Sequence, residues 1–401
     1  MSDTTSWASP GWTPDDSQRI PKTEQALGAA SPEDVGPAAP DPVAFGASPG
    51  GYSPAPGSPP PAGWTPPPKP GLIPLRPLEF GTVLSASFQV LRRNPRPTFG
   101  AALLLNALVV FLSSGTSTAI VFSGLDRASR ASVADSDAIF AGTIALTIVA
   151  ALLTVGVSVV AQALLQGIIS LEVARATLGE KLTLSQLFAL GKGRWWALIG
   201  WTAILVAVIT AAFGVLIALS IGFFAVGDPA AIVGGIALLI FGLLGLLVVS
   251  VWIATMLAFV PAGIVLERLS IVAAVRRSWN LVRGSFWRIL GILVLVTVMI
   301  NIAVSIVTAP LQVVATFAVP LVNPAGQLET DLTAFLALNI AVIAVTAVVG
   351  AIGVVLSTAV TSLLYIDRRM RTEGLDLDLQ RYVELRATGA TGADPYRTAA
   401  P

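Results

Sequence analysis

The chain has 401 residues, of which 54% are hydrophobic and only 12% are charged, and its formal net charge is +1. Soluble domains carry about 25% charged residues, so this composition excludes an ordinary globular protein. The sequence contains neither His nor Cys, so it lacks the commonest general base and metal ligand, and disulfides are excluded. We therefore expect no catalytic residue, no metal site and no cofactor.

Residues 1–70 are rich in Pro, Gly, Ala and Ser and contain few aliphatic side chains. Such a segment buries too little apolar surface to offset the entropy of ordering, which predicts a disordered N-terminal tail. No apolar core follows the first residues, so we do not expect a signal peptide. The tetrapeptide GWTP occurs at 11–14 and again at 63–66, either as low-complexity drift or as a docking motif for a cytosolic protein.

Six stretches without any Asp, Glu, Lys or Arg follow this tail. Each is longer than the ~20 residues that a helix needs to cross the hydrocarbon core of a bilayer. Asp228-Pro229 separates the third stretch from the fourth by a tight turn. We therefore predict an all-α integral membrane protein with six transmembrane helices, arranged as three hairpins. The stretches are 97–125, 138–171, 195–227, 229–266, 289–328 and 332–366.

Basic residues gather in alternate loops between these stretches. Together, residues 76–96, 172–194, 267–288 and 367–386 hold 18 Lys and Arg, whereas the three intervening loops hold two. Positively charged loops remain in the cytoplasm. The pattern therefore predicts a multi-pass protein of the plasma membrane with both termini in the cytoplasm.

A short motif marks the start of three of the stretches. The sequence GRWWALIG at 193–200 aligns without a gap with GSFWRILG at 284–291, and a weaker copy ends at Gly100. Arg92, Lys192 and Arg283 lie eight residues before the final glycine of each copy. The spacing predicts three repeats, at about 78–175, 182–268 and 269–371. They form a membrane domain over 71–386, which we expect to be followed by a disordered C-terminal tail over 387–401.

Each repeat begins with a leading segment that has the pattern of a basic amphipathic helix: about 78–96, 182–194 and 269–288. In the third, Val272, Val275, Trp279 and Val282 share one helical face and the arginines share the other. Such a helix suits the membrane surface, where it acts either as an orientation anchor or as a site for anionic phospholipids. The candidate headgroup ligands are Arg92, Arg93, Lys192, Arg194, Arg276, Arg277, Arg283 and Arg288, and the candidate interfacial anchors are Trp195, Trp196, Trp279, Phe286 and Trp287.

The second leading segment also contains a helix-start signal. Thr183 and Gln186 have the residue types and the spacing of a capping box, in which each side chain bonds the other residue's backbone amide. A short helix is therefore predicted to begin after Thr183.

The three hairpins end alike, with one acid followed closely by an arginine. We predict that the pairs Glu172 with Arg175, Glu267 with Arg268, and Asp367 with Arg368 lock the repeats together. The alternatives are solvated helix caps, or carboxylates that catalyse a reaction or coordinate a cation. The spans themselves hold only neutral polar side chains, which argues against a proton- or sodium-driven transporter.

Residues 267–291, ERLSIVAAVRRSWNLVRGSFWRILG, resemble a signature, RRSW-x-LVRG-x-FWR, of actinobacterial polytopic membrane proteins. These proteins are named after the membrane domain of glycerophosphoryl diester phosphodiesterases. Residues 73–96 and 365–380 are similar to the same family. In full-length phosphodiesterases of that kind, a separate TIM barrel performs the chemistry with two histidines. The resemblance therefore implies a link to phospholipid metabolism without catalysis.

These observations favour a non-enzymatic plasma-membrane protein that engages anionic phospholipids in envelope or lipid homeostasis. One alternative is a passive transporter, channel or lipid-translocating protein that uses the interface between repeats as a path. Another is a membrane scaffold that recruits a cytosolic partner through residues 1–70. Nucleic acid is not an expected partner, because the basic residues adjoin membrane spans.

Overall fold

Six long apolar helices dominate the structure. The computed structural model describes residues 71–130, 136–322, 328–390 and 392–397, and all regular secondary structure within these ranges is helical. Each of the six helices is long and apolar enough to cross a bilayer, as the sequence predicts. The tail expected at residues 1–70 lies outside the described residues. The spans are Arg96–Gly124, Asp137–Thr177, Trp195–Ala225, Pro229–Leu266, Phe286–Val314 and Ile340–Glu373.

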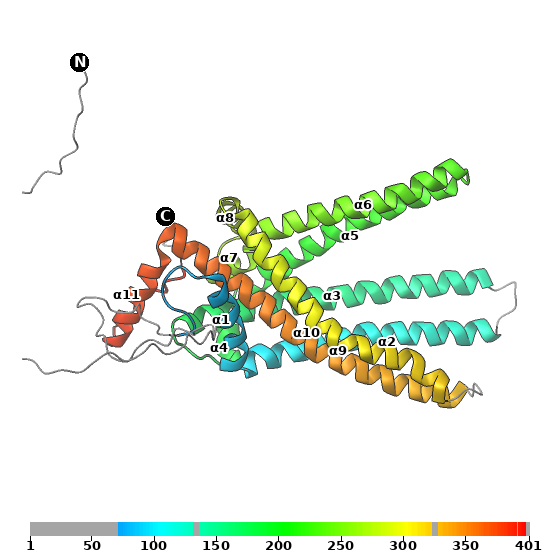
Figure 1. Ribbon diagram of the computed structural model, residues 1–401, viewed down its shortest axis with the longest axis horizontal. Helices are drawn as coiled ribbons and strands as arrows, with labels where there is room; N and C mark the ends of the chain where they lie inside the picture. Colours follow the sequence, from blue (N-terminus) through cyan, green and yellow to red (C-terminus); the bar gives the residue numbers. More distant parts are fainter. Residues whose placement is uncertain (1–70, 131–135, 323–327, 391, 398–401) are drawn as a thin grey trace, which may run out of the picture. The chain divides into compact units, whose positions relative to one another are not determined.

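The long helices pack in pairs that follow their order in the chain (Figure 1). A tight turn joins the second pair, where Gly227 has a φ of +73° and Asp228 caps the next helix by accepting from the Ala230 amide at 3.1 Å. Descent of the pairs from one repeated unit stays a prediction. The pairs are α2 (Ala101–Arg130) with α3 (Ser136–Thr177), α5 (Trp195–Ala225) with α6 (Pro229–Met256), and α9 (Phe286–Val322) with α10 (Leu328–Glu373).

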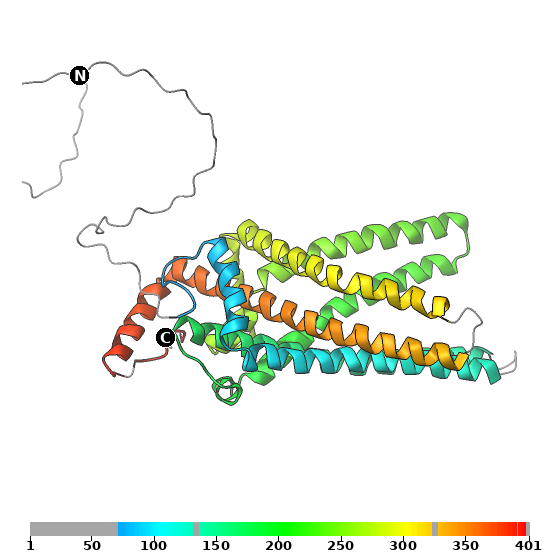
Figure 2. The same cartoon turned by 60° about the horizontal axis from the view of Figure 1, so that its bottom comes forward.

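Five short helices gather at one end of this bundle, which we call the polar end (Figures 1 and 2). A π-helical turn, η1 (Arg96–Gly100), leads from the first of them into α2. The chain therefore places its short helices together at the polar end. The short helices are α1 (Phe80–Arg93), α4 (Leu184–Leu190), α7 (Val260–Leu266), α8 (Ile271–Arg283) and α11 (Leu375–Ala387).

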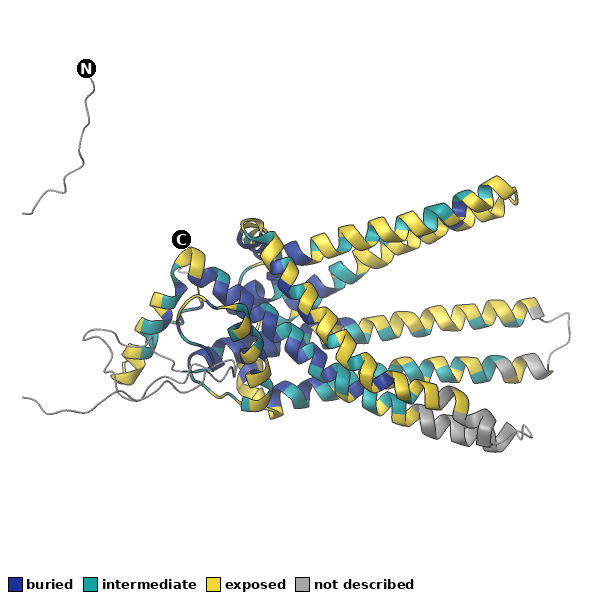
Figure 3. Cartoon of the chain, in the orientation of Figure 1, coloured by how far each residue is buried: buried dark blue, intermediate teal, exposed yellow. Residues whose placement is uncertain are grey.

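The buried core of the protein lies mainly at the polar end (Figure 3). In the six spans, only 6% to 22% of the most apolar window is buried within the protein. Large side chains such as Leu104, Phe140 and Phe241 are exposed along their length. Soluble proteins rarely expose contiguous apolar surface of this extent, whereas hydrocarbon solvates it without cost. The six helices therefore form a membrane-embedded bundle held together chiefly at one end.

Helix α8 has a buried side and an exposed side. Ala274, Ser278 and Leu281 are buried against the rest of the polar end, whereas Val272 is 70% exposed and Trp279 is also exposed. The apolar face expected from the sequence is thus divided: Val272 and Trp279 are turned outward, where they can meet lipid, whereas Val275 is half-buried and Val282 is buried. Trp279 meets Trp252 of α6 edge to face, with ring centroids 5.6 Å apart.

The helix that begins as α6 is interrupted before α7. Pro261 lacks an amide hydrogen and disfavours a continuous helix through the residues before it. Ser278 of α8 repairs the break: its hydroxyl donates to the Met256 carbonyl at 2.7 Å and accepts from the Phe259 amide at 3.2 Å. One buried side chain thereby satisfies two backbone groups and fixes α8 to the end of the fourth span.

Replacing Ser278 with Ala should leave both backbone groups buried without a partner. Each buried group without a partner costs about 1–3 kcal/mol of stability. We therefore expect Ser278→Ala to give a clear decrease in the unfolding temperature measured in detergent. Ser285→Ala is the matched control, because the Ser285 hydroxyl is also buried but has no hydrogen-bond partner among the described residues. Equal unfolding temperatures for the two variants would contradict the bridging role.

The C-terminal segment corrects one expectation. We expected residues 387–401 to be disordered, but residues 392–397 pack onto the polar end, and Tyr396 is 2% exposed. Its hydroxyl forms a hydrogen bond with that of Thr177, and its carbonyl accepts from Arg369 at 3.1 Å. Burial raises the pKa of the Tyr396 phenol, so it remains protonated. The prediction of disorder relied on the Gly- and Ala-rich composition of this segment and gave no weight to its single tyrosine. Residues 398–401 lie outside the described part.

Candidate functional site

The aromatic residues of the repeated motif occupy equivalent environments. Helices α5 and α9 begin at the aligned residues Trp195 and Phe286, both of which are half-buried. The next residue in each copy faces outward: Trp196 is 82% exposed and Trp287 is 80% exposed. Tryptophans favour the membrane–water boundary, so two such residues at the polar end mark the level of that boundary on the bundle.

Trp195 is held in place by its neighbours. Its ring packs against Phe188, with centroids 5.1 Å apart, and its Nε1 donates to the Phe188 carbonyl at 3.2 Å. Gly191 and Gly167 lie directly against the ring, and a Cβ added to either would overlap it. The capping box expected before this segment is confirmed, because Thr183 and Gln186 satisfy each other's backbone amides at the start of α4.

Four of the eight candidate basic residues are exposed and have no hydrogen-bond or ion-pair partner within the described ranges. They include the three residues that lie eight positions before the final glycine of each motif copy. The equivalent position of every leading segment therefore presents a cation outward. We call these four residues the exposed cations; they are Arg92, Lys192, Arg276 and Arg283.

The other four basic candidates are engaged within the protein. Arg93 Nη1 donates to the Ala176 carbonyl at 3.2 Å, and Arg277 contacts two carboxylates. Arg194 at the start of α5 donates to the Leu269 carbonyl at 3.3 Å. Arg194 joins the second leading segment to the third, whereas Arg93 and Arg277 join their segments to the ends of the long helices, so we interpret their role as structural.

Arg288 makes the corresponding contact with the first leading segment. From the start of α9, its Nη2 donates to the Leu78 carbonyl at 3.3 Å. Leu78 and Leu269 occupy the same position in their motif copies, 22 residues before the final glycine. The start of α5 thus holds the third leading segment as the start of α9 holds the first.

The first leading segment is also bonded by the carboxylate of Asp367, which is buried near the end of the last span. Its Oδ1 accepts from the Leu78 amide at 2.7 Å, and Arg371 contacts both carboxylate oxygens at 3.0 Å. Arg371 also donates to the Leu78 carbonyl at 2.7 Å, and Arg288 lies 3.8 Å from Asp367. We call this group the Leu78 clamp; it joins residues 289 positions apart.

The ion pairs expected between neighbouring acids and arginines are wrong in their partners. Glu172 accepts from the side-chain amide of Asn94 at 3.0 Å, whereas Arg175 pairs with Asp394 and Glu180. Residues three positions apart on a helix can form a pair, but here each side chain has a partner from another segment, which the local spacing does not reveal.

The other two expected pairs differ in the same way. Arg268 adopts a φ of +58° in the turn after α7 and donates to the Lys192 carbonyl at 2.6 Å. Arg368 donates to the Leu281 carbonyl at 3.2 Å, while Asp367 pairs with Arg371, one helical turn further on. The acids do connect separate segments, but through other donors.

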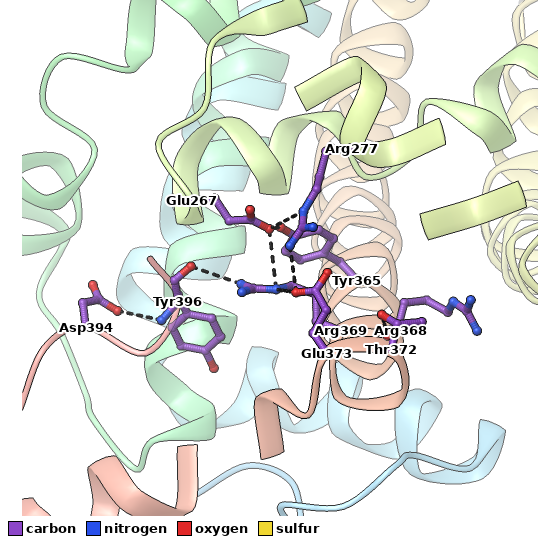
Figure 4. Close-up of polar contacts among 9 residues, drawn as sticks. All are labelled: Glu267, Arg277, Tyr365, Arg368, Arg369, Thr372, Glu373, Asp394 and Tyr396. Carbon is purple, nitrogen blue, oxygen red and sulfur yellow. Dashed lines mark hydrogen bonds and ion pairs between the residues drawn. The ribbon is translucent and has the colours of Figure 1, made fainter. Parts of the chain in front are cut away.

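Glu267 lies at the centre of a buried charge network (Figure 4). Its Oε1 accepts hydrogen bonds from the Tyr365 hydroxyl and, at 3.2 Å, from Arg277 Nε. The same oxygen lies 3.5 Å from Arg369 Nε. Glu373 completes the network, at 2.7 Å from Arg277 and 3.0 Å from Arg369. Two arginines thus face two carboxylates, and the network ties α7, α8 and α10 together.

The electrostatics of this network favour a structural role. Desolvation opposes the charge on Arg277, but the carboxylates of Glu267 and Glu373 outweigh it and raise its pKa. Arg369 also lies over the Tyr365 ring, 5.9 Å from its centroid. Each charge is therefore matched within the network. Sequence reasoning missed Tyr365, Arg369 and Glu373, although Arg369 and Glu373 have the four-residue spacing of a helical ion pair.

The described residues contain no cluster of three or more acidic side chains placed to hold a metal ion. The segment from the Leu78 clamp to the last span, residues 78–364, matches a family model described as a domain of unknown function, DUF7847. The chain belongs to the DUF7847 family. No curated protein and no solved structure matches it. The matched DUF7847 region begins at Leu78, the residue that Asp367 holds.

Asp367→Asn should open the Leu78 clamp of this DUF7847 protein. The substitution keeps the shape of the side chain but removes the charge that Arg371 and Arg288 face. We expect faster amide hydrogen exchange in peptides that contain Leu78, measured by mass spectrometry in detergent or nanodiscs. Asp378→Asn on the exposed side of α11 is the control. Unchanged exchange at Leu78 in the Asp367 variant would contradict the clamp.

The contacts of the Glu267 network in the DUF7847 domain predict which of two substitutions destabilises the protein more. Glu267→Gln leaves two arginines facing a neutral side chain, and breaking a buried pair in this way is strongly destabilising. Tyr365→Phe removes only one hydroxyl and keeps both ion pairs. We therefore expect a much larger fall in unfolding temperature for Glu267→Gln than for Tyr365→Phe; the reverse order would show that Glu267 is not the centre of the network.

Proposed function

We propose that this protein is a non-enzymatic, multi-pass plasma-membrane protein whose polar end engages anionic phospholipids. One observation carries the proposal: Arg92, Lys192 and Arg283 occupy equivalent positions in the three leading segments, and all are exposed without a partner within the described ranges. If these cations had a structural role, at least some of them would form hydrogen bonds or ion pairs within the protein. Their common outward placement suits negatively charged groups that arrive from outside the protein.

The surroundings of the exposed cations support a phospholipid as the source of that charge. A basic residue near an anionic membrane surface contributes about 1 kcal/mol to binding. The outward-facing Trp196 and Trp287 begin the spans directly after Lys192 and Arg283, so these cations lie close to the boundary where headgroups reside. The positive-inside rule makes this the cytoplasmic leaflet and puts both termini in the cytoplasm.

The broader assignment combines the site with the sequence resemblance. A threefold internal repeat is supported for the second and third copies by the aligned aromatic residues at which α5 and α9 begin, and for all three by the equivalent exposed cations Arg92, Lys192 and Arg283. The similarity of residues 267–291 to actinobacterial polytopic proteins that are named after the membrane domain of glycerophosphoryl diester phosphodiesterases supports a role in envelope or phospholipid homeostasis. Catalysis is not part of the proposal, since the chain has no histidine and its buried carboxylates face arginines, amides or a phenol.

The exposed cations can be tested by removing charge without touching the structural arginines. In nanodiscs of mixed anionic and zwitterionic phospholipids, we expect Lys192→Gln with Arg283→Gln to reduce anionic-lipid enrichment about fivefold for each lost charge. Adding Arg92→Gln should reduce it further. The readout is lipid mass spectrometry of the protein with its retained lipids.

A matched control removes the same net charge from the opposite end of the bundle. Arg127→Gln with Arg130→Gln should leave the enrichment unchanged, because these residues lie at the far end of α2. If both double variants lose enrichment equally, selectivity reflects net charge alone and the proposed surface is wrong.

A second candidate is a passive transporter, channel or lipid-translocating protein. It is favoured by the amides of Gln162 and Gln166, which have no hydrogen-bond partner among the described residues although they lie in the second span. Liposomes that contain the protein should then show flux of a labelled lipid or solute above empty controls. The scaffold alternative depends on residues 1–70, which lie outside the described part, and it stays a prediction.

A further inference from the structure

A pocket of about 480 Å³ opens within the spanning part of the bundle. Its walls come from α3, α6, α7, α9 and α10, together with the break between α6 and α7. The volume falls within the range typical of small-molecule sites. None of the lining side chains is charged, so the pocket does not suit an ion or a charged headgroup.

The pocket begins at the depth of the interfacial aromatic residues. Gly167 of α3 lies directly against the Trp195 ring, so its neighbour Gln166, which lines the pocket, lies at the same level of the bundle. Gln162 lines the pocket about one helical turn, or ~5 Å, further into the hydrocarbon. At the level of such tryptophans, a phospholipid passes from its headgroup to its acyl chains.

The polar groups of the pocket divide into satisfied and unsatisfied ones. The hydroxyls of Ser357, Thr361 and Ser362 each donate to a carbonyl of their own helix. Four other lining side chains have no side-chain hydrogen bond within the described ranges, namely Gln162, Gln166, Thr297 and Thr358. In a hydrocarbon environment such groups are costly unless a ligand or water bonds them.

The pocket is accessible from the surrounding bilayer. Val251 of α6 and Val294 and Val298 of α9 line it and are also exposed. A ligand can therefore arrive laterally from the lipid phase. It must offer neutral hydrogen-bonding groups at interfacial depth and an apolar continuation below them.

We propose that this pocket binds one diacyl lipid. Its ester carbonyls accept hydrogen bonds from the amides of Gln162 and Gln166, and one acyl chain extends along Leu293, Val294 and Val298. This site is separate from the exposed cations and does not depend on them. It selects the glycerol-ester region common to membrane lipids, whereas the exposed cations select headgroup charge.

The test uses the full-length protein in nanodiscs of a single zwitterionic phospholipid doped with a probe that carries a diazirine on one acyl chain. Photolysis should attach the probe to peptides that cover 290–298 and 354–361. In Gln162→Leu with Gln166→Leu, which removes both amides at similar side-chain size, we expect about tenfold less attachment at these peptides. Native mass spectrometry should show a parallel loss of one retained lipid.

Three further variants make every outcome informative. Asn301→Leu removes an amide of α9 outside the pocket and should change nothing. Thr297→Val with Thr358→Val is nearly isosteric and should reduce attachment even if the Leu variant folds poorly. Lys192→Gln with Arg283→Gln should keep attachment while losing anionic selectivity, which separates the two proposals. Attachment spread evenly over all spans, or unchanged in both pocket variants, would contradict a lipid site built on these polar groups.

Discussion

The contact between the Asp367 carboxylate and the Leu78 amide is the constraint on which the arrangement of the polar end depends. Along the chain, the end of one helix pair is followed directly by the next leading segment. The last pair has no such successor, and the Leu78 clamp supplies the missing connection by joining it to the first segment. Arg371 and Arg288 reinforce the same point by bonding the Leu78 carbonyl.

This closure matters because the spans bury only a small part of their own apolar surface within the protein. Their apolar side chains face lipid over most of their length, and lipid tails solvate them as well as another helix would. Association must therefore rely on hydrogen bonds, ion pairs and small-residue packing at the polar end. The Glu267 network, the Ser278 bridge and the buried Tyr396 all lie there. Together they hold the leading segments in register and leave the exposed cations facing outward.

The spans were predictable because apolar length is a property of the sequence alone, and the capping box was predictable because it involves residues three positions apart. The sequence did not predict which of the eight basic candidates are exposed and which are bonded within the protein. Arg276 and Arg277 are adjacent and chemically identical, yet one is exposed and the other is bonded to Glu267. That difference depends on α10, which brings Glu373 beside Arg277 from 96 residues away. The position of Tyr396 likewise depends on a distant residue, because its hydroxyl bonds that of Thr177, 219 positions away.

The central claim is that the leading segments lie on one face of the membrane and present their cations together. The chain has no cysteine, so single cysteines at positions 92, 192 and 283 report without interference. In oriented membrane vesicles labelled with an impermeant maleimide, all three positions should react from the same side, and a cysteine at Arg127 should react only from the other. Reaction of any one of the three from the side that labels position 127 would contradict the account.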